Sequence, residues 1–289
     1  MRIFRILTTL TLAVLAILAG AVSAPGSAHA APFRIAIMQD SPEMARQYQP
    51  VLDYLRARGV EASYVSTRDY TEAALMFADG KVDGMFSGSG IAGTLIIKGL
   101  ARPIVRPLAT DGTSTYHAVV VARRGAQRFT GEADYFRGKR VTFCALASSG
   151  EFFFHSIGGA VEAAAKAITA PTHGDALTAL SRGMADIAIV KNLVWDAQQA
   201  RYPDLVRVGG DMGENPNNAF VISRKTNAAF ANEIKDLLLG LGDDTSAEAE
   251  AVRESLGITR FIETSVSDFS HTIPMLRAAG VGASFAFKY

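Results

Sequence analysis

Residues 140–150 read Arg-Val-Thr-Phe-Cys-Ala-Leu-Ala-Ser-Ser-Gly, an apolar run that leads into a short turn of small residues. The apolar run predicts a strand at residues 140–144, and the residues after the turn predict a helix at 149–166. Backbone N–H groups at the start of a helix, with the hydroxyls of Ser148 and Ser149 beside them, can hold an anion. The turn by itself favours the simpler interpretation, in which Ser148 caps the helix.

The same alternation of strand and helix runs along the rest of the chain. Strands are predicted at residues 33–38, 60–65, 82–86, 102–109, 116–122, 186–190, 205–208 and 218–223. Helices are predicted at residues 43–58, 70–78, 90–98, 173–182 and 192–200, and the remainder up to residue 279 is expected to be mainly helical. This alternation is typical of βαβ units around parallel sheets, so the predicted fold class is α/β.

The predicted elements divide into two similar α/β halves of roughly a hundred residues each, an ordinary size for a domain. The long extended runs at residues 116–122 and 218–223 are the candidate crossings between the halves. A cleft between two such lobes is where a small ligand is expected to bind.

The composition excludes several classes of protein. The 289 residues include 29 Lys and Arg against 28 Asp and Glu, with 49% hydrophobic and 20% charged residues. A nucleic-acid-binding protein normally carries a basic excess or a basic stripe, and this sequence has neither. The proportions are those of a globular chain rather than a disordered one. The single cysteine excludes an intramolecular disulfide and a multi-cysteine metal site.

The first thirty residues have the pattern of a signal peptide. Arg2 and Arg5 form a positive start, residues 6–22 are largely apolar, and Ala28-His-Ala30 supplies a small-residue cleavage site. A membrane anchor is the alternative, because the apolar run is nearly long enough to cross a bilayer. The cleavage site favours removal of residues 1–30 and export to the periplasm. No cysteine lies near that site, so a lipoprotein is not expected.

A second turn of small residues is Ser87-Gly-Ser-Gly90, again between a predicted strand and a predicted helix. Residues 88–93 also match the dinucleotide-binding pattern G-x-G-x-x-G, with Asp111 near the expected acidic position. The third-strand position, the absence of a predicted strand ending at Asp111 and the predicted export argue against a dinucleotide. What remains is a turn in which Gly90 lets backbone amides approach an anion and Ser89 adds a hydroxyl.

Patterns for catalysis or metal binding are scarce. The sequence contains neither the H-E-x-x-H zinc motif nor the G-x-S-x-G nucleophile motif. The histidines after the signal peptide do not cluster at the spacing of metal ligands; they are His117, His155, His173 and His271. Cys144 ends an apolar strand, where a buried and inert thiol is expected. We therefore expect no catalysis, no metal ion and no cofactor.

Several stretches, read in order, resemble one known family. They are Ser-Pro-Glu-Met at 41–44, Tyr-Gln-Pro-Val-Leu-Asp-Tyr-Leu at 48–55, Thr-Arg-Asp-Tyr at 67–70, Gly-Lys-Val-Asp-Gly-Met-Phe at 80–86, Arg-Pro-Leu-Ala-Thr-Asp-Gly-Thr-Ser-Thr-Tyr at 106–116, Phe-Arg-Gly-Lys-Arg-Val-Thr-Phe at 136–143, Ser-Ser-Gly at 148–150, Thr-His at 172–173 and Ala-Leu-Thr-Ala-Leu at 176–180. Their order and spacing resemble the phosphonate-binding family of periplasmic solute-binding proteins. The resemblance extends from Phe33 to about Arg224 and fades in the C-terminal part.

The resemblance implies a two-lobed periplasmic-binding-protein (venus-flytrap) fold that has two hinge strands and closes on an oxyanion. It implies a first lobe at residues 31–115, a second lobe at residues 116–222, and a return to the first lobe with C-terminal helices at residues 223–289.

Binding positions of the family carry over to single residues of this chain. Tyr70 and Tyr116 match tyrosines whose hydroxyls reach the ligand. Ser148, Ser149 and Gly150 match most of the family's Ser-Thr-Ser-Gly phosphoryl cradle, although Ala147 replaces its first serine. His173 matches a histidine at the start of a helix, where ligand contact and helix capping remain alternatives. The predicted ligand-binding set is Tyr70, Ser89, Gly90, Tyr116, Ser148, Ser149, Gly150, His173 and Asn218.

Three departures from the family bear on the ligand. Ala92 stands where the family has a tyrosine. Aminophosphonate binders of the family hold an ammonium with two acidic side chains, where this chain has Lys191-Asn-Leu193 and Asn217-Asn218. An ammonium buried without such partners is costly. The departures therefore argue against 2-aminoethylphosphonate and favour phosphate, phosphite, methylphosphonate or a close analogue.

Three functions are compatible with these observations. The leading hypothesis is a monomeric periplasmic protein that delivers a small phosphorus oxyanion to an ABC permease in the inner membrane. The alternative is a subunit that senses an oxyanion or arsenite and signals to a membrane histidine kinase; Cys144 bears on it, because arsenite binds thiols. An exported enzyme that uses the turn at Ser89 or at Ser148 is the third, although no paired base is visible.

Overall fold

The computed structural model describes residues 32–37 and 45–289 of the chain. The predicted signal peptide at residues 1–30 lies outside the described residues, as do residues 43 and 44 at the start of a predicted helix. Within the described ranges, no helix has the length and apolar character needed to cross a membrane.

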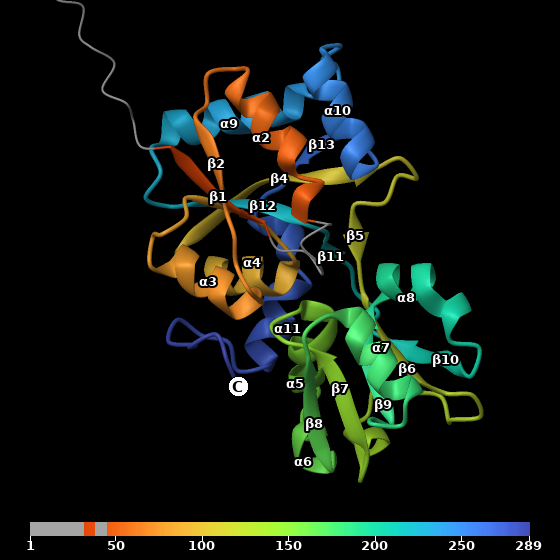
Figure 1. The fold of residues 1–289 in the computed structure, drawn as a ribbon. Helices are drawn as coiled ribbons and strands as arrows, with labels where there is room; N and C mark the ends of the chain where they lie inside the picture. The colour runs from red at the N-terminus through yellow and green to blue at the C-terminus, as the bar shows by residue number, and fades with distance from the viewer. Residues whose placement is uncertain (1–31, 38–44) are drawn as a thin grey trace, which may run out of the picture. The chain divides into compact units, whose positions relative to one another are not determined.

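A six-stranded sheet forms the framework of the first lobe (Figure 1). Its strands, in the order β13-β4-β12-β3-β1-β2, are β13 (Ile258–Glu263), β4 (Ala101–Ala109), β12 (Ala219–Ser223), β3 (Gly84–Ser87), β1 (Phe33–Ile37) and β2 (Ala62–Val65). β1 pairs in parallel with β2 and β3, whereas β12 pairs antiparallel with β3 and β4. The first lobe is therefore built from two parts of the chain that are far apart in sequence.

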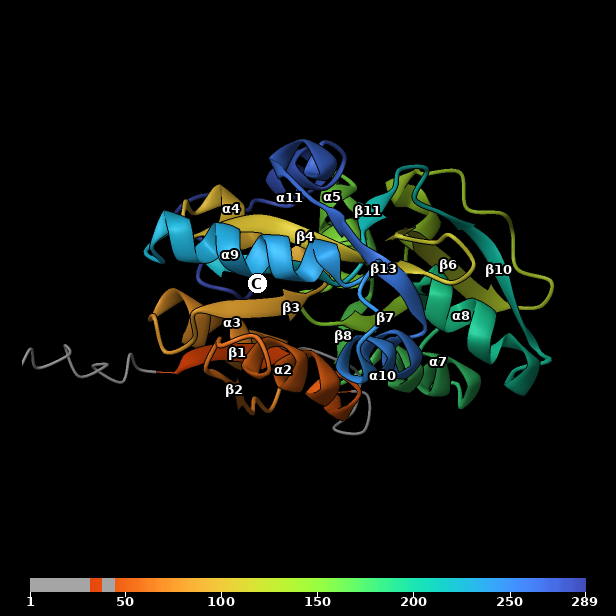
Figure 2. The same cartoon turned by 90° about the horizontal axis from the view of Figure 1, so that it is seen from above.

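Helices cover both faces of this sheet, as Figure 1 shows. One face packs against α2 (Gln49–Arg56), α9 (Ala228–Gly240) and α10 (Ala247–Leu256), and the other against α3 (Tyr70–Ala78), α4 (Ser89–Ile97) and α11 (Thr272–Ala278). Alternation along β12 serves both faces: Phe220 and Ile222 point to the first group of helices, and Ala219 and Val221 to the second. α9 contacts β4 and β13 along its length (Figure 2).

A five-stranded sheet forms the second lobe. In the order β10-β6-β9-β7-β8, its strands are β10 (Leu205–Gly210), β6 (Ala118–Arg123), β9 (Ile187–Lys191), β7 (Arg140–Cys144) and β8 (Lys166–Ala170). α7 (His173–Ser181) and α8 (Asn192–Gln198) pack on one face, against Val119 and Val121 of β6. The other face, which includes Val120, packs on the phenylalanines at residues 152–154. These phenylalanines belong to the same apolar cluster as α4 and α11, so one core extends through both lobes.

Each lobe carries the same arginine–aspartate arrangement at the start of its parallel strands. Arg34 donates from its backbone N and from Nε to Asp83, the latter over 2.9 Å, and Arg140 makes the same pair of bonds to Asp186, with Nε at 3.0 Å. The repeated arrangement supports the expectation of two similar halves.

Two short strands carry the chain between the lobes. β5 (Thr115–Tyr116) and β11 (Asn215–Pro216) pair antiparallel, with Tyr116 opposite Asn215. The prediction that the extended runs at 116–122 and 218–223 themselves cross between the lobes is wrong in detail. Residues 118–123 form β6 inside the second sheet, and residues 219–223 form β12 inside the first, so the crossing takes place just before each of these strands.

Two predicted helical regions differ from the structure. The helix predicted at 149–166 is a π-helical turn at Ser148–Phe152 followed by the short helices α5 (Phe153–Ser156) and α6 (Ala160–Ala163), after which the chain enters β8. Gly150 has non-helical backbone angles (φ −128°, ψ −106°), which interrupts a regular helix. The region after residue 223 contains three helices, as expected, but also the edge strand β13.

The last residues of the chain form a strap, defined here as residues 282–289, that contacts both lobes. Lys98, at the end of α4, donates from Nζ to the carbonyl oxygens of Ala283 (2.6 Å) and Phe285 (2.8 Å). On the other side, Tyr289 stacks on His155, with ring centroids 3.7 Å apart. The strap therefore joins α4 of the first lobe to the segment that follows Phe152 in the second.

Candidate functional site

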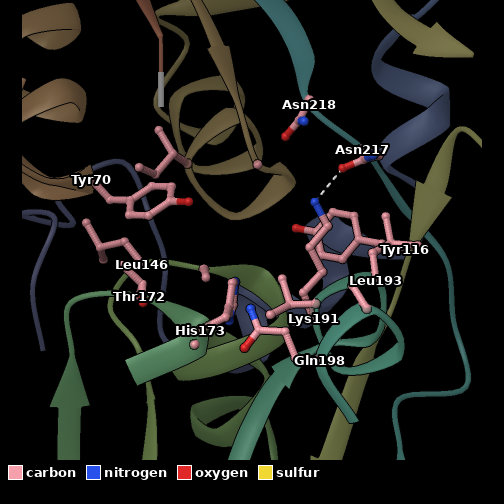
Figure 3. Close-up of a pocket in the computed structure, with 16 residues that line it drawn as sticks. Tyr70, Tyr116, Leu146, Thr172, His173, Lys191, Leu193, Gln198, Asn217 and Asn218 are labelled. Atoms are coloured by element: carbon pink, nitrogen blue, oxygen red, sulfur yellow. Dashed lines mark hydrogen bonds between the residues drawn. The ribbon is translucent and has the colours of Figure 1, made fainter. Parts of the chain in front are cut away.

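A cavity of about 490 Å³ lies where the two lobes meet (Figure 3). It is lined by Tyr70, Gly88, Ile91, Tyr116, Leu146, Ala147, Thr172, His173, Gly174, Lys191, Leu193, Val194, Ala197, Gln198, Asn217 and Asn218. Several of these residues lie at or just after the carboxyl ends of strands in the two sheets, Gly88 after β3 and Lys191 at the end of β9 among them, which is where ligands bind in α/β folds. Both sheets therefore contribute residues to the wall of the same cavity.

The first lobe contributes Tyr70, Gly88 and Asn218 to the cavity wall. Asp69 caps α3 by accepting a hydrogen bond from the backbone N of Glu72 (2.8 Å), which places Tyr70 at the first helical position. The Tyr70 hydroxyl points into the cavity in Figure 3. Asn218 has a left-handed backbone (φ 47°), a conformation that asparagine tolerates better than most residues.

The second lobe contributes His173, Thr172 and the turn after β7. Thr172 caps α7, because its hydroxyl accepts a hydrogen bond from the backbone N of Asp175 (3.0 Å). The capping role considered for His173 thus belongs to its neighbour, and His173 lies in the cavity wall with only 4% of its surface exposed. Leu146 lines the same wall with a positive φ of 52°, which is strained for a bulky side chain.

Lys191 is the lysine of the cavity wall. Its Nζ donates to Oδ1 of Asn217 over 2.5 Å and lies 4.5 Å from the centre of the Tyr116 ring (Figure 3). None of the described residues that line the cavity is an aspartate or a glutamate. The described wall therefore suits an anion better than a cation.

A cluster of hydroxyls lies behind the wall. Ser89 Oγ hydrogen bonds to the Tyr116 hydroxyl and to Ser148 Oγ, each over 2.8 Å, and Tyr116 also hydrogen bonds to Ser148. Burial raises the pKa of Tyr116, so this phenol is neutral and can donate. Ser89 and Ser148 come from different lobes, and a Cβ on Gly90 would lie 2.6 Å from the backbone N of Ser148. The cluster thus joins the lobes and requires glycine at position 90.

Ser149 and Gly150 are also buried, next to this cluster. Ser149 has no exposed surface, and its Oγ has no hydrogen-bond partner among the described residues. A Cβ on Gly150 would lie 2.7 Å from the carbonyl oxygen of Cys144, so close packing on β7 explains this glycine. The regular helix start expected as an anion cradle at residues 148–150 is not formed, because the segment is a π-helical turn.

The predicted ligand-binding set therefore separates into two groups. Tyr70, Tyr116, His173 and Asn218 line the cavity. The remaining residues lie in the buried contact between the lobes rather than in the cavity wall; they are Ser89, Gly90, Ser148, Ser149 and Gly150. The G-x-G-x-x-G match at residues 88–93 opens α4, where Gly90 and Gly93 serve close packing.

Several cavity residues were absent from the predicted set, Lys191, Asn217 and Gln198 among them. Lys191 ends β9, which is parallel to β7, so the rule that ligands lie at the carboxyl ends of parallel strands points to it. The sequence pattern alone gave no comparable signal for Gln198. Cys144 is buried, as expected, with Sγ 3.4 Å from the carbonyl oxygen of Pro171. The described residues contain no group of three or more His, Cys, Asp or Glu side chains placed to hold a metal ion.

Comparison with known proteins gives one family and many structures. The model of a family described as ABC transporter, phosphonate, periplasmic substrate-binding protein matches residues 33–269. No curated protein sequence matches the chain.

Three solved structures illustrate the likeness of fold. XAC2383 from Xanthomonas citri bound to ATP is 15% identical, with 87% of this chain and 98% of that chain covered and a TM-score of 0.71. A binding protein component of an ABC phosphonate transporter (PA3383) from Pseudomonas aeruginosa is 14% identical, with 86% and 87% covered and a TM-score of 0.67. PhnD1 from Prochlorococcus marinus in complex with methylphosphonate is 15% identical, with 86% and 98% covered and a TM-score of 0.66.

Proposed function

Because this chain belongs to the family of periplasmic substrate-binding proteins of phosphonate ABC transporters, we propose that it binds a small phosphorus oxyanion in the cavity between its lobes and delivers it to an ABC permease. Phosphate, phosphite and short alkylphosphonates are the proposed ligands. We also propose that residues 1–30 are removed when the protein is exported to the periplasm. The mature protein is proposed to carry no lipid anchor and to act as a monomer.

One observation carries this proposal: the cavity is walled by polar side chains from both lobes that favour an anion. Tyr70 and Asn218 come from the first lobe, and His173 and Lys191 from the second. A ligand that contacts all four residues interacts with both lobes at once. Such contacts exist together only when the lobes are closed, so binding favours the closed state.

Each of these side chains has a proposed role in holding the oxyanion. The Tyr70 hydroxyl and the Asn218 amide donate to its oxygens, as does the His173 ring. Lys191 supplies a positive charge, which shortens and strengthens hydrogen bonds to an anion. The buried hydroxyls of Ser148 and Ser149 reach a ligand only if the contact between the lobes rearranges, because both residues are fully buried.

Two comparisons support a phosphorus ligand. The Prochlorococcus structure holds methylphosphonate and the Xanthomonas structure holds ATP, so phosphorus oxyanions bind to related folds. The family description names a transporter component and does not favour the sensing alternative.

The experiment is a thermal-shift series on residues 31–289, unfolded and refolded to remove bound ligand. The ligands are phosphate, phosphite, methylphosphonate and 2-aminoethylphosphonate, with sulfate as the control anion. A ligand at 100 times its dissociation constant adds about 2.7 kcal/mol to the free energy of unfolding, which raises the melting temperature measurably. We expect a rise with a phosphorus oxyanion and none with sulfate; no response to any phosphorus compound contradicts the proposal.

A pair of tyrosine variants locates the binding site. Tyr70→Phe removes a hydroxyl from the cavity and is expected to reduce the shift, since a hydrogen bond to a charged group contributes about 1.5–3 kcal/mol. Tyr64→Phe is the matched control, because Tyr64 lies outside the cavity and is 41% exposed. If the ligand raises the melting temperature of both variants equally, the ligand does not contact the Tyr70 hydroxyl and binds outside this part of the cavity.

A further inference from the structure

One helix of the second lobe, α8, presents an apolar face to the cavity. Leu193, Val194 and Ala197 all line the cavity, and their spacing places them on one side of the helix. Trp195, between them in sequence, is buried instead, with 5% of its surface exposed, and packs in the apolar cluster of the second lobe. Leu193 belongs to none of the apolar clusters formed by the described residues. Its side chain therefore contributes to the cavity wall rather than to a core.

The start of α8 is fixed by backbone bonds to the second sheet. The backbone N of Asn192 donates to the carbonyl oxygen of His117 (3.0 Å), and the backbone N of His117 donates to Oδ1 of Asn192 (2.9 Å). These bonds and the buried Trp195 hold the helix against the sheet at its first two turns. The apolar face of α8 is therefore a fixed part of the wall.

The cavity has space for more than a phosphonate group along this face. Its volume is about 490 Å³, whereas a water molecule takes roughly 30 Å³ in the liquid, so methylphosphonate occupies roughly a third of the space. Ile91 of α4 and Leu146 after β7 add further apolar surface. Leu146 and Leu193 lie on opposite sides of the view in Figure 3. The wall therefore accommodates a carbon chain attached to the phosphorus.

The charges of the wall bear on what that chain carries at its end. Among the lining residues that the structure describes, none is a carboxylate. An ammonium on the chain has no acidic partner there, and a buried charge without a partner is costly. An uncharged apolar end has no such cost and gains from contact with α8. The wall thus suits an alkyl chain better than an aminoalkyl chain.

We propose that the preferred ligand is a phosphonate with an uncharged alkyl chain longer than methyl, such as propyl, which packs on Leu193, Val194 and Ala197. This inference rests on the proposed function, because the polar residues of the cavity are taken to hold the phosphorus oxyanion. Each further methylene removed from water multiplies the affinity by about fourfold. The ammonium of Lys191 hydrogen bonds to Asn217, and its charge has no part in this selection.

The test compares dissociation constants measured by isothermal titration calorimetry on residues 31–289. The probes are methylphosphonate, propylphosphonate and 2-aminoethylphosphonate; the last two have the same length and differ in the charge at the end of the chain. We expect propylphosphonate to bind at least about tenfold more tightly than methylphosphonate, and more tightly than 2-aminoethylphosphonate.

Two outcomes overturn the inference while the proposed function stands. One is binding of methylphosphonate as tight as that of propylphosphonate, and the other is tighter binding of 2-aminoethylphosphonate than of propylphosphonate. Failure of all three phosphonates and of phosphate to bind contradicts the proposed function itself.

Two variants assign the preference to α8. Leu193→Asn keeps a side chain of similar size but makes it polar, and the ratio of the dissociation constants of methylphosphonate and propylphosphonate is expected to fall towards one. Ala197→Leu fills space on the same face and is expected to lower the same ratio. Leu75→Asn is the matched control and retains the ratio, because Leu75 lies on α3 outside the cavity wall and is 43% exposed. A ratio that both α8 variants leave unchanged overturns the assignment.

Discussion

Two adjacent serines differ sharply in their hydrogen bonds. Ser148 Oγ hydrogen bonds to the hydroxyls of Ser89 and Tyr116, whereas Ser149 Oγ has no partner among the described residues, although both side chains are fully buried. A buried hydroxyl without a partner costs stability, and in a binding protein such a group is a candidate contact for the ligand.

The two serines therefore predict opposite effects of alanine. Ser148→Ala removes bonds between the lobes and is expected to lower the free energy of unfolding by about 1–2 kcal/mol. Ser149→Ala removes an unpaired polar atom and is expected to leave stability unchanged or raised. It weakens phosphonate binding by about 1–3 kcal/mol only if the contact between the lobes rearranges so that Ser149 reaches the ligand. Urea unfolding and calorimetric titration measure the two quantities. Equal destabilisation by both variants shows that Ser149 has a structural partner.

Gly90 controls how closely the lobes approach. In Gly90→Ala the new Cβ lies 2.6 Å from the backbone N of Ser148 and 2.7 Å from the carbonyl oxygen of Leu146. Both are backbone atoms, which cannot rotate away from the added methyl group as a side chain could. We expect a loss of about 1–3 kcal/mol in unfolding free energy, the usual cost of overpacking.

Gly240→Ala is the control for Gly90→Ala. Gly240 lies at the end of α9, and a Cβ added to it has no atom within 4 Å. A stabilisation of up to about 1 kcal/mol is expected, because alanine favours a helix. The changes in unfolding free energy of both variants are measured by chemical unfolding. If Gly90→Ala leaves this free energy unchanged, Gly90 is not in tight contact with residues 146–148.

At the scale of elements, patterns of burial and turn residues identified most of the fold. α3 begins and ends where its sequence predicts, at residues 70 and 78, and β7 likewise at residues 140 and 144. β8 was missed because the predicted helix was extended to Lys166 and no strand was predicted after it, although Ile168 and Thr169 favour a strand. β13 was missed because a register shift between Ile258 and Arg260 breaks the strand alternation.

The π-helical turn at Ser148–Phe152 could not be predicted from propensity, because tertiary contacts hold it. Glu151 is 8% exposed and accepts a hydrogen bond from the backbone N of Leu146 over 3.2 Å, which supports the strained turn. Burial raises the pKa of Glu151 above its ordinary value. Folding therefore shifts the equilibrium of this carboxyl group towards its protonated form.

This shift predicts a pH dependence. A raised folded-state pKa contributes stability that is fully present below the unfolded pKa and is lost as the pH rises through the folded value. Glu151→Gln keeps an acceptor for Leu146 but does not ionise, so it is expected to be more stable than the unaltered protein at pH 7 and similar near pH 4. Melting temperatures across this range measure the difference, and a constant difference contradicts the assigned pKa.

For the molecule as a whole, the cavity residues could be predicted only in part. Tyr70, Tyr116, His173 and Asn218 carry recognisable motifs or positions, and all four line the cavity. The turn at residues 148–150 was assigned to the ligand through the family resemblance, and the turn at Ser89 and Gly90 because such turns can bind anions. Here they face each other across the contact between the lobes, and that contact depends on how two sheets pack, which no local pattern encodes.

The same contact offers a test of closure. Ser89 Oγ and Ser148 Oγ lie 2.8 Å apart on different lobes, and Cys144, the single natural cysteine, is buried. The double variant Ser89→Cys, Ser148→Cys is expected to form a disulfide under mild oxidation, because disulfides need closely spaced Cβ atoms. Release of a bound phosphonate should then be much slower until a reductant is added. Failure to form the bond shows that the lobes do not meet this way in solution.

The central place of β12 affects the order in which the protein can fold during synthesis. Residues 118–210, with all five strands of the second sheet, leave the ribosome before β12, which lies between β3 and β4 of the first sheet. The second lobe can therefore mature while the first is still an incomplete sheet with exposed edges. Pulse-labelled hydrogen exchange on nascent chains is expected to protect β6, β7 and β9 before β3 and β4.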